Sequence, residues 1–96
     1  MSDLERFVAN DRFARLLGIR ITRCGAGAAT AEVEIAEEHL NSAATAHGGF
    51  IFSLADAAFS AASNSHGVLS VAIATSISYF KAASTGKLKS DESTPM

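Results

Sequence analysis

The sequence predicts a small α+β domain, and two features carry this prediction. Residues 19–24 and 29–35 alternate between apolar and polar side chains around a glycine-rich turn at 25–27, which is typical of a β-hairpin. Residues 48–64 are rich in alanine and phenylalanine and apolar almost all round, as expected of a helix that is buried on most sides. With 96 residues, the chain forms at most one domain, and its core is marginal.

Further elements are expected on both sides of these two. Ser2 or Asp3 can cap an N-terminal helix, in one piece or two, that ends at Gly18. Residues 37–46 are expected to form a polar connection, whereas residues 68–80 contain β-branched side chains in partial alternation, which predicts a long strand. The apolar face of the N-terminal helix would consist of Phe7, Phe13, Leu16 and Leu17.

The end of the chain differs in character from the rest. Residues 84–96 contain almost nothing to bury, so a disordered tail is expected there. Residues 1–83 would then form a partial domain, because a helix that is apolar on every side needs more sheet than three strands supply. The additional strands needed to bury this helix would come from another subunit of an oligomer or from further C-terminal chain.

Composition narrows the classes of function. A hydrophobic content of 48% and a charged content of 19% are typical of a soluble globular protein, and a net charge of −2 without a basic stripe argues against nucleic-acid binding. Asp56 and several glycines interrupt the longest apolar stretch, which argues against a membrane span, and the charged N-terminal residues do not resemble a signal peptide. Cys24 is the only cysteine, which favours a cytoplasmic protein without disulfides. No spacing of histidines indicates a metal site, and no cofactor is expected.

One charge stands out in the apolar helix. Asp56 is the only formally charged residue between Glu38 and Lys81. Burying an unpaired carboxylate costs several kcal/mol, roughly, so its presence calls for a reason. Eight residues upstream, the triplet at 47–49 marks the start of the same helix, where backbone N–H groups and the helix dipole favour negative charge. An isolated acid and an anion-binding helix start together suggest hydrolysis of an acyl group.

The segment around these residues resembles a known family. Residues 39–59 read HLNSAATAHGGFIFSLADAAF, which is similar to the hotdog-fold acyl-CoA thioesterases and, more narrowly, to the phenylacetate-pathway thioesterase group. Residues 62–67 (ASNSHG) and 77–81 (ISYFK) also resemble that group. The resemblance implies an antiparallel sheet wrapped around a central helix, with active sites at the interface of a homodimer or homotetramer. It also implies an aryl-acetyl or similar acyl-CoA as substrate.

The resemblance also assigns roles by position. Asp56 takes the place of the catalytic carboxylate, as nucleophile or as general base toward water. Gly48 matches the glycine whose N–H polarises the thioester carbonyl. His47 and Asn41 match polar residues that orient the thioester or the attacking water.

Three further residues are candidates for substrate binding. Gly49 belongs to the same glycine pair as Gly48, and Ser60 follows Asp56 by one helical turn. Lys81 falls where a basic side chain meets the phosphates of coenzyme A in the family.

For an enzyme of this kind, helix geometry independently predicts at least two subunits. Gly48 and Asp56 are eight positions apart, which is about 12 Å along a helix axis. A hydrogen-bond donor and a nucleophile that act on one carbonyl must each lie within about 3 Å of the reacting atoms. One helix does not bring both to the same thioester, whereas two antiparallel helices from two subunits do.

Each of these residues also has a structural interpretation. Asp56 could pair with a buried partner, His47 could only cap the helix, and Asn41 could be a turn residue. The glycine pair could permit close packing, Ser60 could pack, and Lys81 could be a solvated strand end. His39 and His66 are expected to be surface or capping residues.

The sequence departs from the family after Lys81. Family members continue with a glycine-acid turn and further strands, whereas here Thr85-Gly86 is followed by only ten residues. Two or three C-terminal strands are therefore expected to be missing. The alternative to an enzyme is a truncated, inactive hotdog fragment that acts at most as a binding subunit. A hotdog hydratase is disfavoured by the Leu-Ala-Asp motif.

Overall fold

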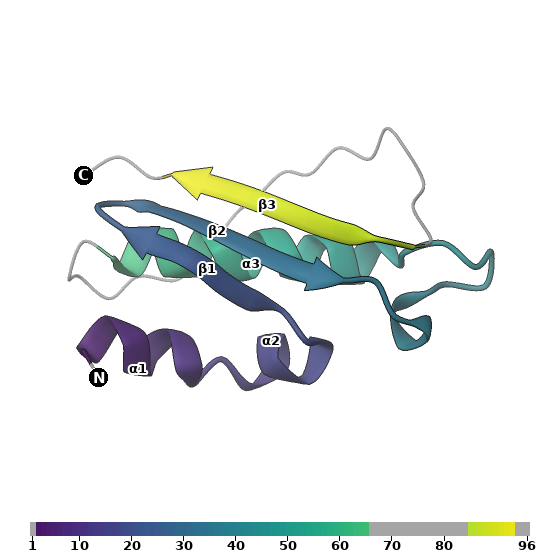
Figure 1. The fold of residues 1–96 in the computed structure, drawn as a ribbon, viewed down its shortest axis with the longest axis horizontal. Helices are drawn as coiled ribbons and strands as arrows, with labels where there is room; N and C mark the ends of the chain where they lie inside the picture. The colour runs from purple at the N-terminus through teal and green to yellow at the C-terminus, as the bar shows by residue number, and fades with distance from the viewer. Residues whose placement is uncertain (1, 66–84, 94–96) are drawn as a thin grey trace.

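The computed structural model describes residues 2–65 and 85–93. Three α-helices, three strands and one short 3₁₀ helix follow each other along the described chain (Figure 1). In order, they are α1 (Asp3–Ala9), α2 (Arg12–Leu17), β1 (Arg20–Gly25), β2 (Ala28–Glu34), the 3₁₀ helix (Glu37–His39), α3 (Gly48–Asn64) and β3 (Lys87–Ser93).

The strands form one antiparallel sheet in the order β1-β2-β3, and α3 runs along one face of it (Figure 1). The two N-terminal helices lie beside β1. This arrangement of an antiparallel sheet packed on a long helix confirms the α+β prediction, and it is what an incomplete hotdog fold presents. The predicted strand at 68–80 lies outside the described residues.

The predicted hairpin is confirmed, and the conformation of its turn explains why a glycine stands at position 27. Only Ala26 and Gly27 connect β1 to β2, with φ values of 51° and 81°. Two successive residues with positive φ form the tight hairpin turn whose twist matches that of the strands, and glycine adopts this conformation without strain. A bulge between Ile21 and Arg23 shifts the register of the hairpin by one residue.

The predicted helix at 48–64 is confirmed with both bounds, and small residues bring it close to the sheet. Its buried face includes Phe50, Leu54 and Ala58, and it packs against Ala31 and Val33 of β2. Alanines without bulky side chains allow the helix and sheet backbones to approach closely, so little space is left between them. Contrary to the expected burial on most sides, the described residues cover mainly one face, and on the opposite face Phe52 is 39% exposed.

The expected disordered tail is wrong over Lys87–Ser93, which form β3. These residues alternate between exposed and half-buried positions, so Leu88 pairs with Val33 in register and packs against the core. β3 also supplies backbone partners to the second edge of β2. A half-exposed strand needs only one apolar residue to anchor it. Its composition is therefore as polar as that of a disordered segment, which is why the sequence suggested disorder.

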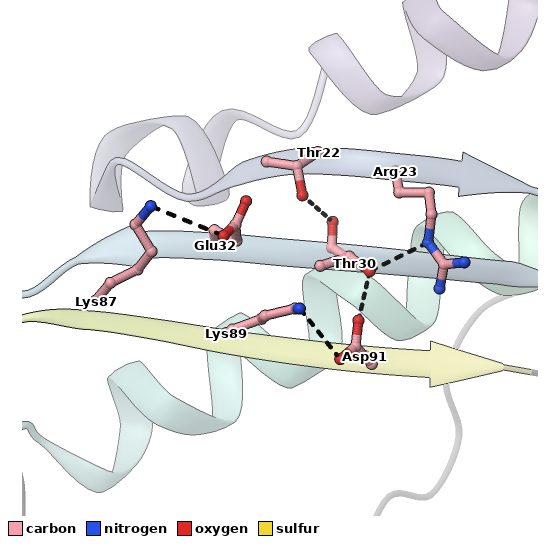
Figure 2. Close-up of polar contacts among 7 residues, drawn as sticks. All are labelled: Thr22, Arg23, Thr30, Glu32, Lys87, Lys89 and Asp91. Carbon is pink, nitrogen blue, oxygen red and sulfur yellow. Dashed lines mark hydrogen bonds and ion pairs between the residues drawn. The ribbon is translucent and has the colours of Figure 1, made fainter.

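Side-chain contacts on the outer face of the sheet further stabilise the position of β3 (Figure 2). The hydroxyl of the buried Thr30 donates to the Asp91 carboxylate over 2.5 Å and accepts from Arg23 Nε over 3.4 Å. The Lys87 ammonium lies 3.9 Å from the Glu32 carboxylate on the neighbouring strand. These polar contacts join all three strands.

The N-terminal helix is in two pieces, as the sequence allowed. Ser2 caps α1 in a reciprocal pair of hydrogen bonds with Glu5, Asp11 caps α2, and Gly18 ends α2 with a φ of 80°. None of the residues of α1 is buried, and Ala14 is the only buried residue of α2. The expected apolar face therefore remains largely open. No helix in the part of the chain that the structure describes is long and apolar enough to cross a membrane.

Candidate functional site

The candidate site is built on the loop that leads into α3. Leu40 and Ala46 form an isolated antiparallel bridge that closes the loop, and the His47 N–H donates to the His39 carbonyl over 2.8 Å. These bonds fix the direction in which the chain enters the helix. The loop therefore acts as a rigid support for the helix start.

Asn41 organises this loop from inside. Its side-chain oxygen accepts hydrogen bonds from the Ala43 N–H at 2.9 Å and from the Thr45 N–H and hydroxyl, both at 3.2 Å. This is the turn role that asparagine commonly plays, in which a short side chain replaces backbone partners. The Asn41 Nδ2 group makes no hydrogen bond to the described residues, so it is left to donate elsewhere.

His47 caps α3 with its side chain. The Gly49 N–H donates to His47 Nδ1 over 2.9 Å, while the Phe50 and Ile51 N–H groups donate to the His47 carbonyl. Because Nδ1 accepts, the proton of the neutral ring lies on Nε2, which is exposed and can donate to a ligand. A Cβ on Gly49 would lie 3.2 Å from Nδ1, so glycine at this position makes room for the imidazole.

Gly48 is the first residue of α3, so its N–H belongs to the helix N-terminus. The residue is half-buried, whereas His47 before it and Gly49 after it are exposed. The helix dipole at this point favours a negatively charged group.

Asp56 lies two turns further along α3, on the side opposite the buried residues Leu54 and Ala58. Its side chain is half-buried, and no hydrogen-bond or ion-pair partner for it occurs within residues 2–65 and 85–93. The structural interpretation that required a buried partner therefore finds none in this part of the chain. Phe52 and Ser60 share its face, one turn before and one turn after.

The structure thus places His47, Gly48 and Gly49 at the start of α3 and Asn41 in the loop before them, and it separates these residues from Asp56. Eight residues of regular helix place Gly48 and Asp56 about 12 Å apart along the axis. Lys81 and His66 lie outside the described residues. Ser60 is half-buried and lines a cavity beside the N-terminal helices.

Two relatives match most of this chain in sequence. An esterase-type protein of Archaeoglobus fulgidus is 53% identical over 78 residues, which are 81% of this chain and 51% of that protein. The acyl-coenzyme A thioesterase PaaI of Escherichia coli is 40% identical over 72 residues, which are 75% of this chain and 51% of that protein. The chain therefore spans about half the length of these relatives.

Solved structures and a family model agree with these relatives. The E. coli PaaI protein from the phenylacetic acid degradation operon superposes with a TM-score of 0.85 at 35% identity, over 91% of this chain and 64% of that one. A mutant of the phenylacetic acid degradation protein PaaI from Thermus thermophilus gives 0.77 at 36% identity, over 82% of this chain and 69% of that one. The thioesterase superfamily model matches residues 43–89. The chain belongs to the thioesterase superfamily.

This thioesterase-superfamily chain holds one site feature that sequence reasoning missed. His39 is 4% exposed, and its ring stacks on Phe50 with the centroids 3.9 Å apart. Its Nδ1 accepts from the Ala36 N–H over 2.8 Å, so Nε2 carries the proton and donates to the Leu17 carbonyl over 2.7 Å. The expectation of a surface residue is wrong, but the capping role is confirmed.

His39 also forms part of a groove at the start of α3. A groove of about 440 Å³ lies between α2 and the first turn of α3, and His47, Gly49 and Ser53 line it together with Phe13. Its walls come from three separate segments, so no single motif in the sequence indicated it. The signal that could have suggested it is His39 itself, a histidine two residues before Asn41 of the Leu-Asn motif.

Two other kinds of chemistry find little support among the residues that the structure describes. No cluster of three or more histidine, cysteine or acidic side chains there could hold a metal ion. Burial raises the pKa of the half-buried Cys24 thiol, whose sulfur lies 3.4 Å from the Ala61 carbonyl oxygen, so a thiolate nucleophile is disfavoured.

Proposed function

We propose that the chain acts as an acyl-CoA thioesterase with a site shared between two copies. The observation that carries the proposal is the position of Asp56, a carboxylate without a partner in the described chain, on the open face of α3. It lies too far from the start of its own helix to share a carbonyl with Gly48. A second copy with an antiparallel α3 would supply the Gly48 N–H to the Asp56 of the first.

In this mechanism, Asp56 attacks the thioester carbonyl directly or removes a proton from the attacking water. The carbonyl oxygen becomes negatively charged, and the Gly48 N–H at the helix start of the partner stabilises it. One such contact contributes about 3 kcal/mol to the transition state. His47 Nε2–H and Asn41 Nδ2 are the donors that orient the thioester or the water.

A thioester suits so small a set of groups. It lacks the resonance of an amide, and its thiolate is a good leaving group, so a carboxylate and one oriented donor suffice. Products are the free acid and coenzyme A. Gly49 and Ser60 would contact the substrate, and Lys81 would bind the coenzyme A phosphates through its ammonium group.

For the acyl group, we propose phenylacetyl, hydroxyphenylacetyl or a similar aryl-acetyl group. The support is the likeness to E. coli PaaI, a protein from the phenylacetic acid degradation operon. We further propose a homodimer or homotetramer in the cytoplasm, since a lone cysteine suits a reducing compartment.

Substitution of the carboxylate tests the chemistry. We expect Asp56→Asn to lower the rate of thiol release from phenylacetyl-CoA by about 10²–10⁴-fold. Because Asp56 lies away from the core face, the same variant should keep the melting temperature of the unmodified chain. If the Asp56→Asn variant is a folded oligomer that hydrolyses phenylacetyl-CoA as fast as the unmodified chain, the proposal is overturned.

Mixing two inactive variants tests whether the site is shared. Proline is accepted at the first position of a helix and removes its N–H, and the extended backbone of His47 suits a following proline. Gly48→Pro should therefore be inactive but folded. Refolding it together with Asp56→Asn should restore about one quarter of the activity, because half of the dimers are mixed and each has one intact site. No recovery in mixed dimers would place both groups in one subunit.

A further inference from the structure

A cavity lies between the N-terminal helices and α3. It has a volume of about 480 Å³ and opens to solvent. Val8 and Ala9 of α1 line one side, and Ala57, Ser60 and Ala61 of α3 line the other. This volume is typical of small-molecule sites, which span roughly 300–1,000 Å³.

The cavity lies next to the proposed nucleophile. Ala57 follows Asp56 directly, and Ser60 lies on the same helix face as Asp56 one turn later. A group bonded to the carbonyl carbon at Asp56 therefore has a short path into the cavity past Ser60. Among the described cavities, the groove near His47 lies toward the opposite end of the same helix.

The inner wall of the cavity is apolar and carries no free charge. Ala14, Ile19 and Ile21 complete it between the helices and β1. Asp11 also lines the cavity, but its carboxylate accepts from the Ala14 N–H over 2.9 Å. Arg15 is exposed, so it stands at the rim. Such a lining favours an uncharged apolar group.

The helix that covers the cavity is only loosely attached. α1 buries none of its residues, and a second cavity of about 380 Å³ lies on its other side, with Val8, Ala9 and Ile21 lining both. Val8 is the residue of α1 that packs against the buried cluster of Ala29, Ala61 and Ala62. Val8 is therefore the main apolar anchor of α1 on the rest of the described chain.

We infer that this cavity receives the acyl group of the thioester and selects for extended apolar acyl groups. The inference rests on the proposed thioesterase function and adds the location of the acyl site and its specificity. An acetyl group leaves the cavity empty, whereas a medium-length alkyl or aryl-alkyl group replaces water along the walls of α1 and α3. Ala9, at the end of the covering helix, then limits the length that fits.

The test combines turnover with direct binding. Thiol release is measured with acetyl-CoA and decanoyl-CoA, and binding of decanoate is measured by calorimetry, for the unmodified chain and two variants. Ala9→Phe fills the cavity from the cover, and Arg6→Phe places the same ring on an exposed part of α1 that does not line the cavity. Ala9 is exposed and α1 has no buried residue, so both variants should fold.

We expect decanoyl-CoA to be hydrolysed with the higher kcat/KM and Ala9→Phe to lower that value by about tenfold or more. Ala9→Phe should weaken decanoate binding similarly, whereas acetyl-CoA turnover and the Arg6→Phe variant should be unaffected. Turnover that does not depend on the acyl group or on Ala9→Phe would overturn the inference and leave the thioesterase standing. If decanoate binding depends on Ala9 but no acyl-CoA is hydrolysed, the cavity binds apolar acids as inferred and the proposed thioesterase function is overturned. Absence of decanoate binding, as when a second copy fills the cavity, would overturn the inference.

Discussion

The interface between β2 and α3 and the N-terminal pair α1–α2 are two regions of very different packing. At the interface, Ala31, Val33 and Ala58 are 0–1% exposed. In the N-terminal pair, Phe13 is 60% exposed and Leu16 is 77% exposed, although both are large and apolar. In the first region the small and large apolar side chains are buried together, whereas the second leaves large ones exposed and has cavities on both sides of α1.

This difference separates the residues that hold the fold from those proposed to act. Stability comes from the face of α3 that contacts the sheet, and Asp56 lies on the other face. The loosely packed helices line the cavity that we infer to receive the acyl group. In a chain arranged in this way, substitutions in the proposed site should have little effect on folding stability. Substitutions in the core should likewise leave the side chains of the proposed site in place.

The largest effect on stability is expected from overpacking the interface between β2 and α3. Ala58→Leu adds three carbon atoms at a position with 0% exposure, so we expect it to lower the free energy of unfolding by about 3 kcal/mol. The matched change in the loose region is Leu16→Ala, for which we expect a change within about 0.5 kcal/mol. Urea unfolding of both variants measures the contrast. Equal losses in the two variants would show that the two regions are packed alike.

The next effect concerns the link between the regions. His39 joins them, because its ring stacks on Phe50 of α3 and bonds to the Leu17 carbonyl at the end of α2. His39→Phe keeps the stack but leaves the Ala36 N–H and the Leu17 carbonyl without partners. We expect a loss of about 2 kcal/mol by urea unfolding.

The exposed neighbour Glu38 provides the control for this change. Glu38→Ala should leave stability within about 0.5 kcal/mol. If His39→Phe is as stable as Glu38→Ala, the hydrogen bonds of the ring do not tie α2 to the rest of the chain.

A smaller effect is expected at the far edge of the sheet, where β3 contacts β2. Asp91→Ala removes the acceptor of the buried Thr30 hydroxyl, which we expect to cost about 1 kcal/mol. Amide hydrogen exchange in residues 87–93 should accelerate. Ser93→Ala, at the exposed end of the same strand, should leave exchange unchanged. Equal exchange in both variants would mean that backbone pairing alone holds β3.

Local patterns were enough to predict the tightly packed region from sequence. The glycine turn, the alternation of the hairpin and the apolar run of α3 each have a short period, and the structure confirms all three. β3 was missed because its anchoring depends on partners far away in the sequence, Val33 for Leu88 and Thr30 for Asp91. Composition alone does not show such pairing.

The candidate site, too, has features that the sequence predicted and features that only the structure shows. The motif located the start of α3 and the acid on it, because both lie in one continuous segment. It did not show that the Asn41 oxygen is fully used within its loop or that Nδ1 of His47 caps the helix. Those hydrogen bonds leave Nδ2 of Asn41 and Nε2 of His47 as the donors that the proposed mechanism can use. Sequence therefore named the residues, and the structure restricts which of their atoms can act.

The smallest expected effect lies in the loose region and depends on pH. Hydrogen bonds from the backbone and side chain of Ser2 lower the pKa of the Glu5 carboxyl. A lowered pKa in the folded state means that the capping bonds contribute at neutral pH and are lost as the pH falls through that pKa. We therefore expect α1 to fray as the pH falls below the ordinary pKa of glutamate, which the chemical shift of the Ser2 amide would report.

Glu5→Gln is the matched control, because its amide oxygen can still accept from Ser2 but does not titrate. In that variant, the Ser2 shift should stay constant over the same range while the tight interface remains folded. Loss of the β2–α3 packing together with α1 in the unmodified chain would contradict the separation of the two regions. It would mean that the N-terminal helix, despite burying no residue of its own, is needed to hold the sheet against α3.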